Sequence, residues 1–212
     1  VCGGSPIEGG CNYDMPEELL DQAIFALVAG DQSGSSTVDA IVNMSFGHMA
    51  TSDDGDGVKY WNLANNMLQR SGGGTIVEGQ YYTHAYVLKW REHDSGWRTG
   101  LRHSNDHCGI VQSGTKNLGM YSNRNGGFRD SGYNIDPQQD RWELVVITGA
   151  GTSATSNTGT SSFYTQDATS GELVHRGTAD RVCSGMSYYR LGWGTGQGPG
   201  KIAGVWGWDS VL

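Results

Sequence analysis

The chain has 212 residues, of which 36% are hydrophobic and only 17% charged, with 34 glycines, 7 tryptophans and 10 tyrosines. This composition excludes a disordered or coiled-coil protein and is typical of one turn-rich, all-β domain. The net charge of −8 would repel a phosphate backbone and no basic block offsets it, so we do not expect nucleic acid as a partner.

The N-terminal region carries few strand signals. We assign residues 1–23 to a Gly/Cys-rich tail with a short helix that starts near Pro16, where acidic residues follow the proline. The longest nearly apolar run, residues 23–30, is far shorter than the roughly 20 residues that span a bilayer, so membrane insertion is not expected. The chain shows no signal peptide and begins at Val1, as a processed secretory product or a trimmed chain would.

The four cysteines lack the C-x-x-C spacing of zinc ribbons and thioredoxin-like motifs. Their wide scatter favours two disulfides in an oxidising compartment over four buried free thiols. Three pairings are possible; we favour Cys2–Cys11 within the tail and Cys108–Cys183 between distant strands. The triplet Asn43-Met44-Ser45 is a possible glycosylation site at Asn43.

From residue 80 onward, short strand candidates alternate with clusters of Gly, Asn, Asp and Ser about every 8–12 residues, which is typical of an antiparallel sandwich or barrel. The segment 149–161 has a linker composition, but strands flank it, so we interpret it as a long surface loop. The predicted strands are Tyr81–Trp90, Thr99–His103, Cys108–Gln112, Leu118–Asn123, Phe128–Tyr133, Arg141–Thr148, Ser162–Thr165, Leu173–Arg176, Tyr188–Trp193 and Ile202–Trp208.

A series of short motifs follows the same order as in a known family. They are the "D-x-S-G" stretch 31–39, the hairpin Asn125-Gly126, the strand 141–149 that contains Trp142, and the segments 162–165, 189–192 and 201–212. Over residues 24–212 the chain thus resembles the laminin-G-like, concanavalin-A-like jelly-roll domains, although the "DG" expected after Tyr164 is missing. The resemblance implies an all-β, antiparallel two-sheet sandwich that recognises a glycan or a protein.

The same resemblance implies calcium as a candidate cofactor. Relatives bind it through an early aspartate, whose position Asp39 occupies, and through an Asp-Glu pair in the last strand, where this chain has Ala203 and Gly204. A separate candidate is the oxygen-rich loop that contains Asp53, Asp54 and Asp56. A solvated acidic turn is the favoured alternative for that loop.

Catalytic patterns are incomplete. Glycoside hydrolases of this fold use a strand with the pattern E-x-D-x-x-E, and here Glu92 and Asp94 fill two positions while Trp97 stands in the third. Possible metal ligands between residues 92 and 108 include His103 and His107, which we place in a loop and interpret as surface histidines.

Aromatic and amide side chains in the loops have the types that bind sugars, with ring faces for the apolar side and amides for the hydroxyls. The candidates are Trp97, Asn105, Asp106, Asn123, Asn125 and Trp193. Our leading hypothesis is therefore a secreted or cell-surface, non-enzymatic recognition domain for a glycan or an extracellular protein. The alternatives are a self-assembling structural subunit of an extracellular filament or coat, and a β-glucan-type glycoside hydrolase.

Overall fold

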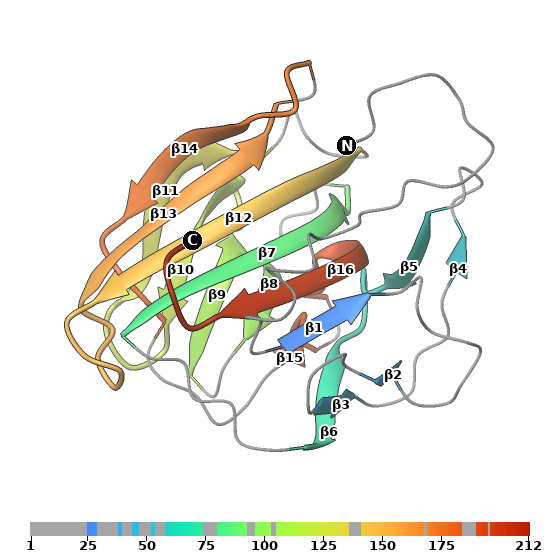
Figure 1. Ribbon diagram of the computed structural model, residues 1–212, viewed down its shortest axis with the longest axis horizontal. Coiled ribbons are helices and arrows are strands. Elements are labelled where there is room, and N and C mark those ends of the chain that lie inside the picture. Colours follow the sequence, from blue (N-terminus) through green and yellow to red (C-terminus); the bar gives the residue numbers. More distant parts are fainter. Residues whose placement is uncertain are drawn as a thin grey trace.

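The computed structural model shows an all-β protein with two antiparallel sheets packed face to face (Figure 1). It describes residues 25–28, 38–39, 44–46, 52–53, 58–73, 80–92, 96–102, 105–135, 141–167, 169–183, 190–194 and 196–212. This confirms the predicted two-sheet sandwich. The predicted N-terminal helix, Cys2, Cys11 and Asn43 lie outside these residues.

Each sheet has eight strands within the described ranges. Sheet I runs in the order β14 (Leu173–Ala179), β13 (Gly159–Gln166), β12 (Trp142–Gly151), β7 (Tyr81–Trp90), β16 (Gly200–Trp208), β5 (Lys59–Asn62) and β4 (Ser52–Asp53), with β1 (Phe25–Val28) also paired to β16. Sheet II runs in the order β11 (Gly127–Asn134), β10 (Asn117–Ser122), β9 (Asp106–Val111), β8 (Arg98–Arg102), β15 (Arg190–Leu191), β6 (Leu68–Gly73), β3 (Met44–Phe46) and β2 (Val38–Asp39). No helix in the described part of the chain is long and apolar enough to cross a bilayer.

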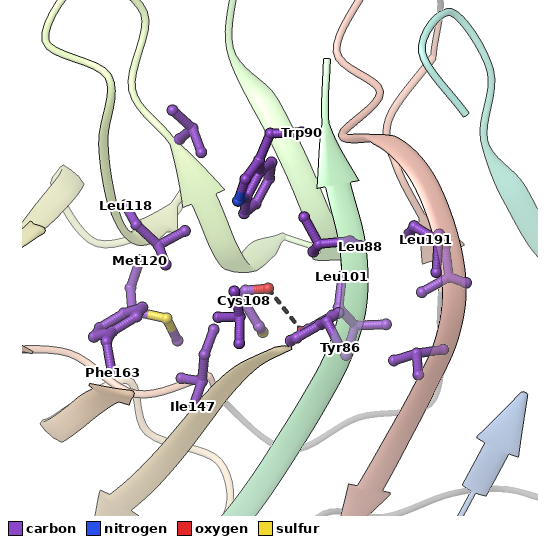
Figure 2. Packing of buried hydrophobic residues seen from close by; sticks show 14 of the residues in the cluster. Tyr86, Leu88, Trp90, Leu101, Cys108, Leu118, Met120, Ile147, Phe163 and Leu191 are labelled. Atoms are coloured by element: carbon purple, nitrogen blue, oxygen red, sulfur yellow. Dashed lines mark hydrogen bonds between the residues drawn. The ribbon is translucent and has the colours of Figure 1, made fainter. Parts of the chain in front are cut away.

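The main core lies between the sheets (Figure 2). Alternation along each strand sends every second side chain inward. From sheet I these include Tyr86, Leu88 and Ile147, and they meet Leu101 and Met120 of sheet II. The hydroxyl of Tyr86 donates to the backbone oxygen of Cys108 at 3.2 Å, so even the polar end of this ring is satisfied inside the core.

Strand β12 is covered on both faces. Val145 and Ile147 belong to the core between the sheets, whereas Val146 joins a second apolar cluster on the outer face of sheet I together with Trp206 and Trp208. Strand β12 is also central, since it pairs with β7 on one side and with β13 on the other. Burial on both faces explains why apolar residues occupy both faces of β12 between Leu144 and Ile147.

The predicted long loop 149–161 is wrong at both ends. Strand β12 continues to Gly151 and β13 begins at Gly159, which leaves only residues 152–158 outside the strands. The reason is packing: a Cβ atom added to Gly149 would lie 2.2 Å from ring carbons of the fully buried Tyr82. The glycines that look like a linker in the sequence make room for an aromatic ring in a strand.

A disulfide and a further buried hydrogen bond also join the sheets. The predicted Cys108–Cys183 disulfide is present, with a Cα–Cα distance of 6.0 Å, and ties β9 of sheet II to the segment after β14 of sheet I. Tyr133 of β11 donates a hydrogen bond to Glu143 Oε1 of β12 at 2.7 Å. Burial raises the pKa of Glu143, and the bond from Tyr133 opposes part of that shift.

Candidate functional site

A pocket of about 300 Å³ opens on the face of sheet II that points away from the core. Its floor comes from strands β8, β9 and β10, and its walls come from the loops beside them. The described lining residues are Trp97, Arg102, Asn105, His107, Ile110, Tyr121, Asn123, Trp193 and Gln197.

Strand alternation places the floor residues. On β9, Cys108 and Val111 belong to the core, whereas His107 and Ile110 line the pocket. Two residues separate Cys108 from Val111, and the strand can keep both inward because Gly109 is an extra, bulged residue with φ +76°. The bulge shifts the alternation by one position, so that Ile110 faces the pocket.

Aromatic rings pack edge to face around the pocket. The centroid of Trp97 is 5.4 Å from that of Tyr121 and 5.5 Å from that of Phe128. His107 lies 5.6 Å from Tyr121 and 6.4 Å from Trp193. These contacts fix the orientations of rings that come from five separate segments of the chain.

Amide groups form the polar part of the rim. The backbone N–H and side-chain Nδ2 of Asn123 both donate to the backbone oxygen of Asn105, at 2.9 and 3.0 Å. In the amide orientation that satisfies both groups, Asn105 Oδ1 accepts two hydrogen bonds from Arg124. The turn before β9 is thereby tied to the turn after β10. Across the pocket, Thr99 N donates to the backbone oxygen of Gln197 at 2.9 Å and holds the β15–β16 loop against β8.

Positive charge gathers at one wall. The guanidinium carbon of Arg102 is 3.2 Å from the centroid of the Trp193 ring, and that of Arg190 is 4.8 Å away. Arg102 and Arg190 are register partners across β8 and β15. Burial lowers the pKa of Arg102, and the neighbouring Arg190 lowers it further.

His107 is neutral at physiological pH. Burial lowers its pKa to about 4; the charge of Arg102 acts in the same direction, while Asp106 opposes both. Its Nδ1 lies 3.0 Å from Thr99 Oγ1, so one ring nitrogen is already engaged. The pocket floor therefore presents an uncharged imidazole beside a charged guanidinium.

Four of the six sequence-predicted binding residues line this pocket: Trp97, Asn105, Asn123 and Trp193. The other two do not. Asp106 is not in a loop but opens β9 and is buried, where it accepts a hydrogen bond from Asn157 Nδ2 at 2.6 Å. Asn125 donates to Asn157 Oδ1 at 2.8 Å, so both residues belong to a structural network under the hairpin.

The prediction omitted Arg102, Ile110, Tyr121 and Gln197, and it placed His107 in a loop although His107 lies in β9. The sequence holds one signal that could have found three of them: Arg102, His107 and Tyr121 each stand next to an apolar residue of the same strand. Alternation puts such neighbours on opposite faces. Arg102, His107 and Tyr121 therefore share the outer face of three neighbouring strands, and such a group of polar and aromatic side chains is a candidate surface site.

Only two of the four predicted metal ligands, Asp39 and Asp53, lie in described strands, so both candidate calcium sites stay predictions. Asp39 is in β2 at the edge of sheet II and Asp53 is in β4 at the edge of sheet I, while Asp54 and Asp56 lie outside the described residues. Among the residues that the structure describes, no group of three His, Cys, Asp or Glu side chains is arranged to hold a metal ion.

Comparisons with known proteins give structural neighbours alone. No family model and no curated protein matches the chain. A Trypanosoma rangeli sialidase in complex with 2,3-difluoro-KDN aligns with a TM-score of 0.52 and 16% identity, over 100% of this chain and 34% of that one. The same sialidase as a covalent intermediate with 2,3-difluorosialic acid aligns with a TM-score of 0.51 and 14% identity, over 91% of this chain and 31% of that one. An engineered GH43 glycoside hydrolase aligns with a TM-score of 0.47 and 14% identity, over 97% of this chain and 44% of that one.

The comparisons bear on two expectations. At such low identity they show the shared fold, and the chain spans about a third of the length of the sialidases. The laminin-G family itself is not confirmed, because no family model matches. The prediction of a non-enzymatic recognition domain is contradicted by the neighbours with TM-scores above 0.5, which are structures of a Trypanosoma rangeli sialidase. The motif series predicted the sandwich but not the kind of protein that contains it.

Proposed function

We propose that this chain is the β-sandwich part of a secreted glycoside-processing enzyme, and that the pocket on sheet II holds the saccharide. The observation that carries the proposal is the lining of the pocket. Tryptophan and tyrosine rings supply apolar surface, and Asn123, Gln197 and Arg102 supply hydrogen-bonding groups. A volume of about 300 Å³ lies at the small end of the range for small-molecule sites. The glycoside-active neighbours and the disulfide support the same proposal.

Hydrolysis by the common two-carboxylate route needs an acid and a base or nucleophile on either side of the glycosidic bond. No carboxylate belongs to the described residues that line the pocket. Glu92, exposed directly after β7, and Asp94, outside the described residues, are the candidates because they precede the pocket residue Trp97 by a few positions.

Binding is tested first. Saccharides are titrated into the chain by calorimetry, with sialosides, xylans and β-glucans among them. We expect Trp97→Ala to weaken binding by about tenfold or more, since it removes one aromatic wall. Tyr81→Ala removes an aromatic ring that is 48% exposed on β7 of the other sheet and is the matched control. Equal affinities of both variants, or no binding by the unmodified chain, would overturn the proposal.

Turnover is tested on the same saccharides by release of reducing ends. Glu92→Gln and Asp94→Asn are expected to lower the rate by about 100-fold or more and to leave the affinity unchanged, because an acid–base group acts on the bond and not on binding. Full activity in both variants would remove these two carboxylates from the mechanism. Binding without turnover on any saccharide would show that the sandwich supplies binding alone and would contradict its enzymatic role.

A further inference from the structure

Two arginines are held against one aromatic ring at the pocket wall. The Arg102 and Arg190 guanidinium carbons are 3.2 and 4.8 Å from the Trp193 centroid. Arginine stays charged in proteins, so two positive charges lie side by side in a protein whose net charge is −8. Their repulsion costs free energy, and the cation–π attraction of the ring offsets part of it.

This arrangement is built into the fold. Arg102 and Arg190 are paired across β8 and β15, and Arg102 is also the register partner of His107 on β9. Trp193 follows Gly192, whose N–H donates to the backbone oxygen of Gly100 at 2.8 Å. Strand pairing and this backbone hydrogen bond hold both arginines and the ring in place. A ligand that binds here therefore loses little free energy to the ordering of these side chains.

Asp106, the acidic residue of β9, faces away from this wall. Asp106 precedes His107, and alternation sends it to the opposite face, where it accepts from Asn157. His107 carries no charge at neutral pH because its pKa is about 4. The described lining thus combines a cation, amides and rings without a carboxylate.

We propose that the saccharide bound in this pocket is acidic, with a carboxylate or sulfate group that Arg102 holds at the Trp193 wall, while Arg190, which contacts Trp193 but is not among the described lining residues, adds positive charge beside it. The inference rests on the proposed saccharide site and adds its substrate class. Guanidinium groups bind planar carboxylates and sulfate oxygens through paired, charge-assisted hydrogen bonds. Trp97 and Tyr121 then face the apolar side of the sugar ring, and Asn123 reaches its hydroxyl groups.

The test uses matched pairs of oligosaccharides that differ only in charge. Oligogalacturonate is compared with its carboxyl-reduced form, and a sulfated galactan with its desulfated form, by calorimetry at low and moderate salt. We expect each acidic member that binds to exceed its neutral partner by about tenfold or more, with an affinity that falls as salt rises.

Variants test whether these two arginines cause the preference for acidic saccharides. Arg102→Gln and Arg190→Gln are each expected to remove most of the preference for the acidic member, and Arg102→Lys to keep part of it, because lysine retains charge without the planar fork. Lys59→Gln removes an exposed positive charge on β5 of the other sheet and is the matched control. Circular dichroism confirms that each variant is folded, and Arg190→Gln, on a half-buried side chain, tests the proposal if Arg102→Gln does not fold.

The outcomes separate the two proposals. Preference for the uronate or for the sulfate identifies which anion the site takes. Equal binding of acidic and neutral members overturns the acidic class but leaves the saccharide site standing. An acidic preference that survives both Gln variants assigns the charge recognition to another surface and overturns the role of Arg102 and Arg190. No binding of any member, together with none in the wider saccharide titration, overturns both proposals.

Discussion

His107 links the pocket to the stability of the fold at the scale of a single residue. Its side chain is 5% exposed, lies against Tyr121 and Trp193, and holds Thr99 through Nδ1. A neutral ring suits this environment, because a proton would place a second charge next to Arg102. The same residue that gives the pocket an uncharged floor therefore makes the folded state sensitive to acid.

We expect the free energy of unfolding to fall as the pH drops from about 6.5 to 4. The unfolded chain binds a proton at His107 near its ordinary pKa of about 6.5, whereas the folded chain does so only near 4. Between these values the unfolded state carries more protons, so acid favours unfolding, by up to about 3 kcal/mol at the end of the range.

Urea unfolding at pH 7 and at pH 4.5 measures this effect, with His107→Gln for comparison. The glutamine variant should be less stable at pH 7 because it loses ring contacts, but it should lose less stability on acidification. His175, exposed on β14, is the control position, and His175→Gln should keep the unmodified slope. Parallel pH profiles for the unmodified chain and His107→Gln would contradict the assignment.

At the scale of single elements, the bulge at Gly109 decides which side chains reach the pocket. A Cβ atom at this position would lie 2.8 Å from Ile147 Cδ1 in the core, and φ is +76°. Both conditions favour glycine, one through packing and one through backbone conformation. Without the bulge, Ile110 would keep the phase of Cys108 and point into the core.

Gly109→Ala should lower the free energy of unfolding by about 2–4 kcal/mol, from left-handed strain together with the contact to Ile147. Gly114→Ala is a matched control: φ is +85° there, and no atom lies within 4 Å of the added Cβ. The control isolates the backbone cost of about 1–2 kcal/mol. Denaturant titration of both variants gives the difference, and equal losses would show that the core contact with Ile147 has no energetic weight.

Strand positions were predictable because clusters of turn-forming residues separate the strands in the sequence. The predicted Tyr81–Trp90 matches β7 at both ends, and the predicted Phe128–Tyr133 falls within β11. The ends of the predicted loop 149–161 were mispredicted because Gly149 leaves room for the ring of Tyr82, which is distant in sequence. A single sequence shows the glycine but not the ring that requires it.

The pocket was predictable in part for a similar reason. Trp97, Asn123 and Trp193 stand out as aromatic or amide residues in loops. Arg102 and His107 lie within strands, and alternation with their apolar neighbours predicts only that both lie on the outer face of sheet II. Their meeting with Trp97 and Trp193 depends on how distant strands pair, and the position of Ile110 depends on the phase shift at Gly109; local patterns encode neither.

At the scale of the whole molecule, the Cys108–Cys183 disulfide joins the two sheets directly beneath the pocket. Cys108 neighbours His107 on β9, and Cys183 N donates to the hydroxyl of Tyr82 at 3.0 Å inside the core. The same hydroxyl lies 3.0 Å from Ser161 Oγ, which in turn donates to the backbone oxygen of Arg181. The bridge therefore ends in a buried polar network that fixes the segment after β14 to sheet I.

Removing this disulfide should destabilise the fold without dismantling the pocket wall. The two cysteines are 75 residues apart, and closing a loop of this length lowers the entropy of the unfolded chain by an amount worth about 4 kcal/mol. The variant Cys108→Ala/Cys183→Ala should thus unfold at a lower denaturant concentration, and reductant should shift the unmodified chain in the same direction while leaving the variant unchanged. Saccharide affinity measured well below the unfolding transition should stay within about twofold, because Trp97, Arg102 and Trp193 are held by strand pairing and ring contacts and not by the bridge. A large loss of affinity in a variant that remains folded would instead show that the bridge sets the position of His107, and with it the geometry of the pocket floor.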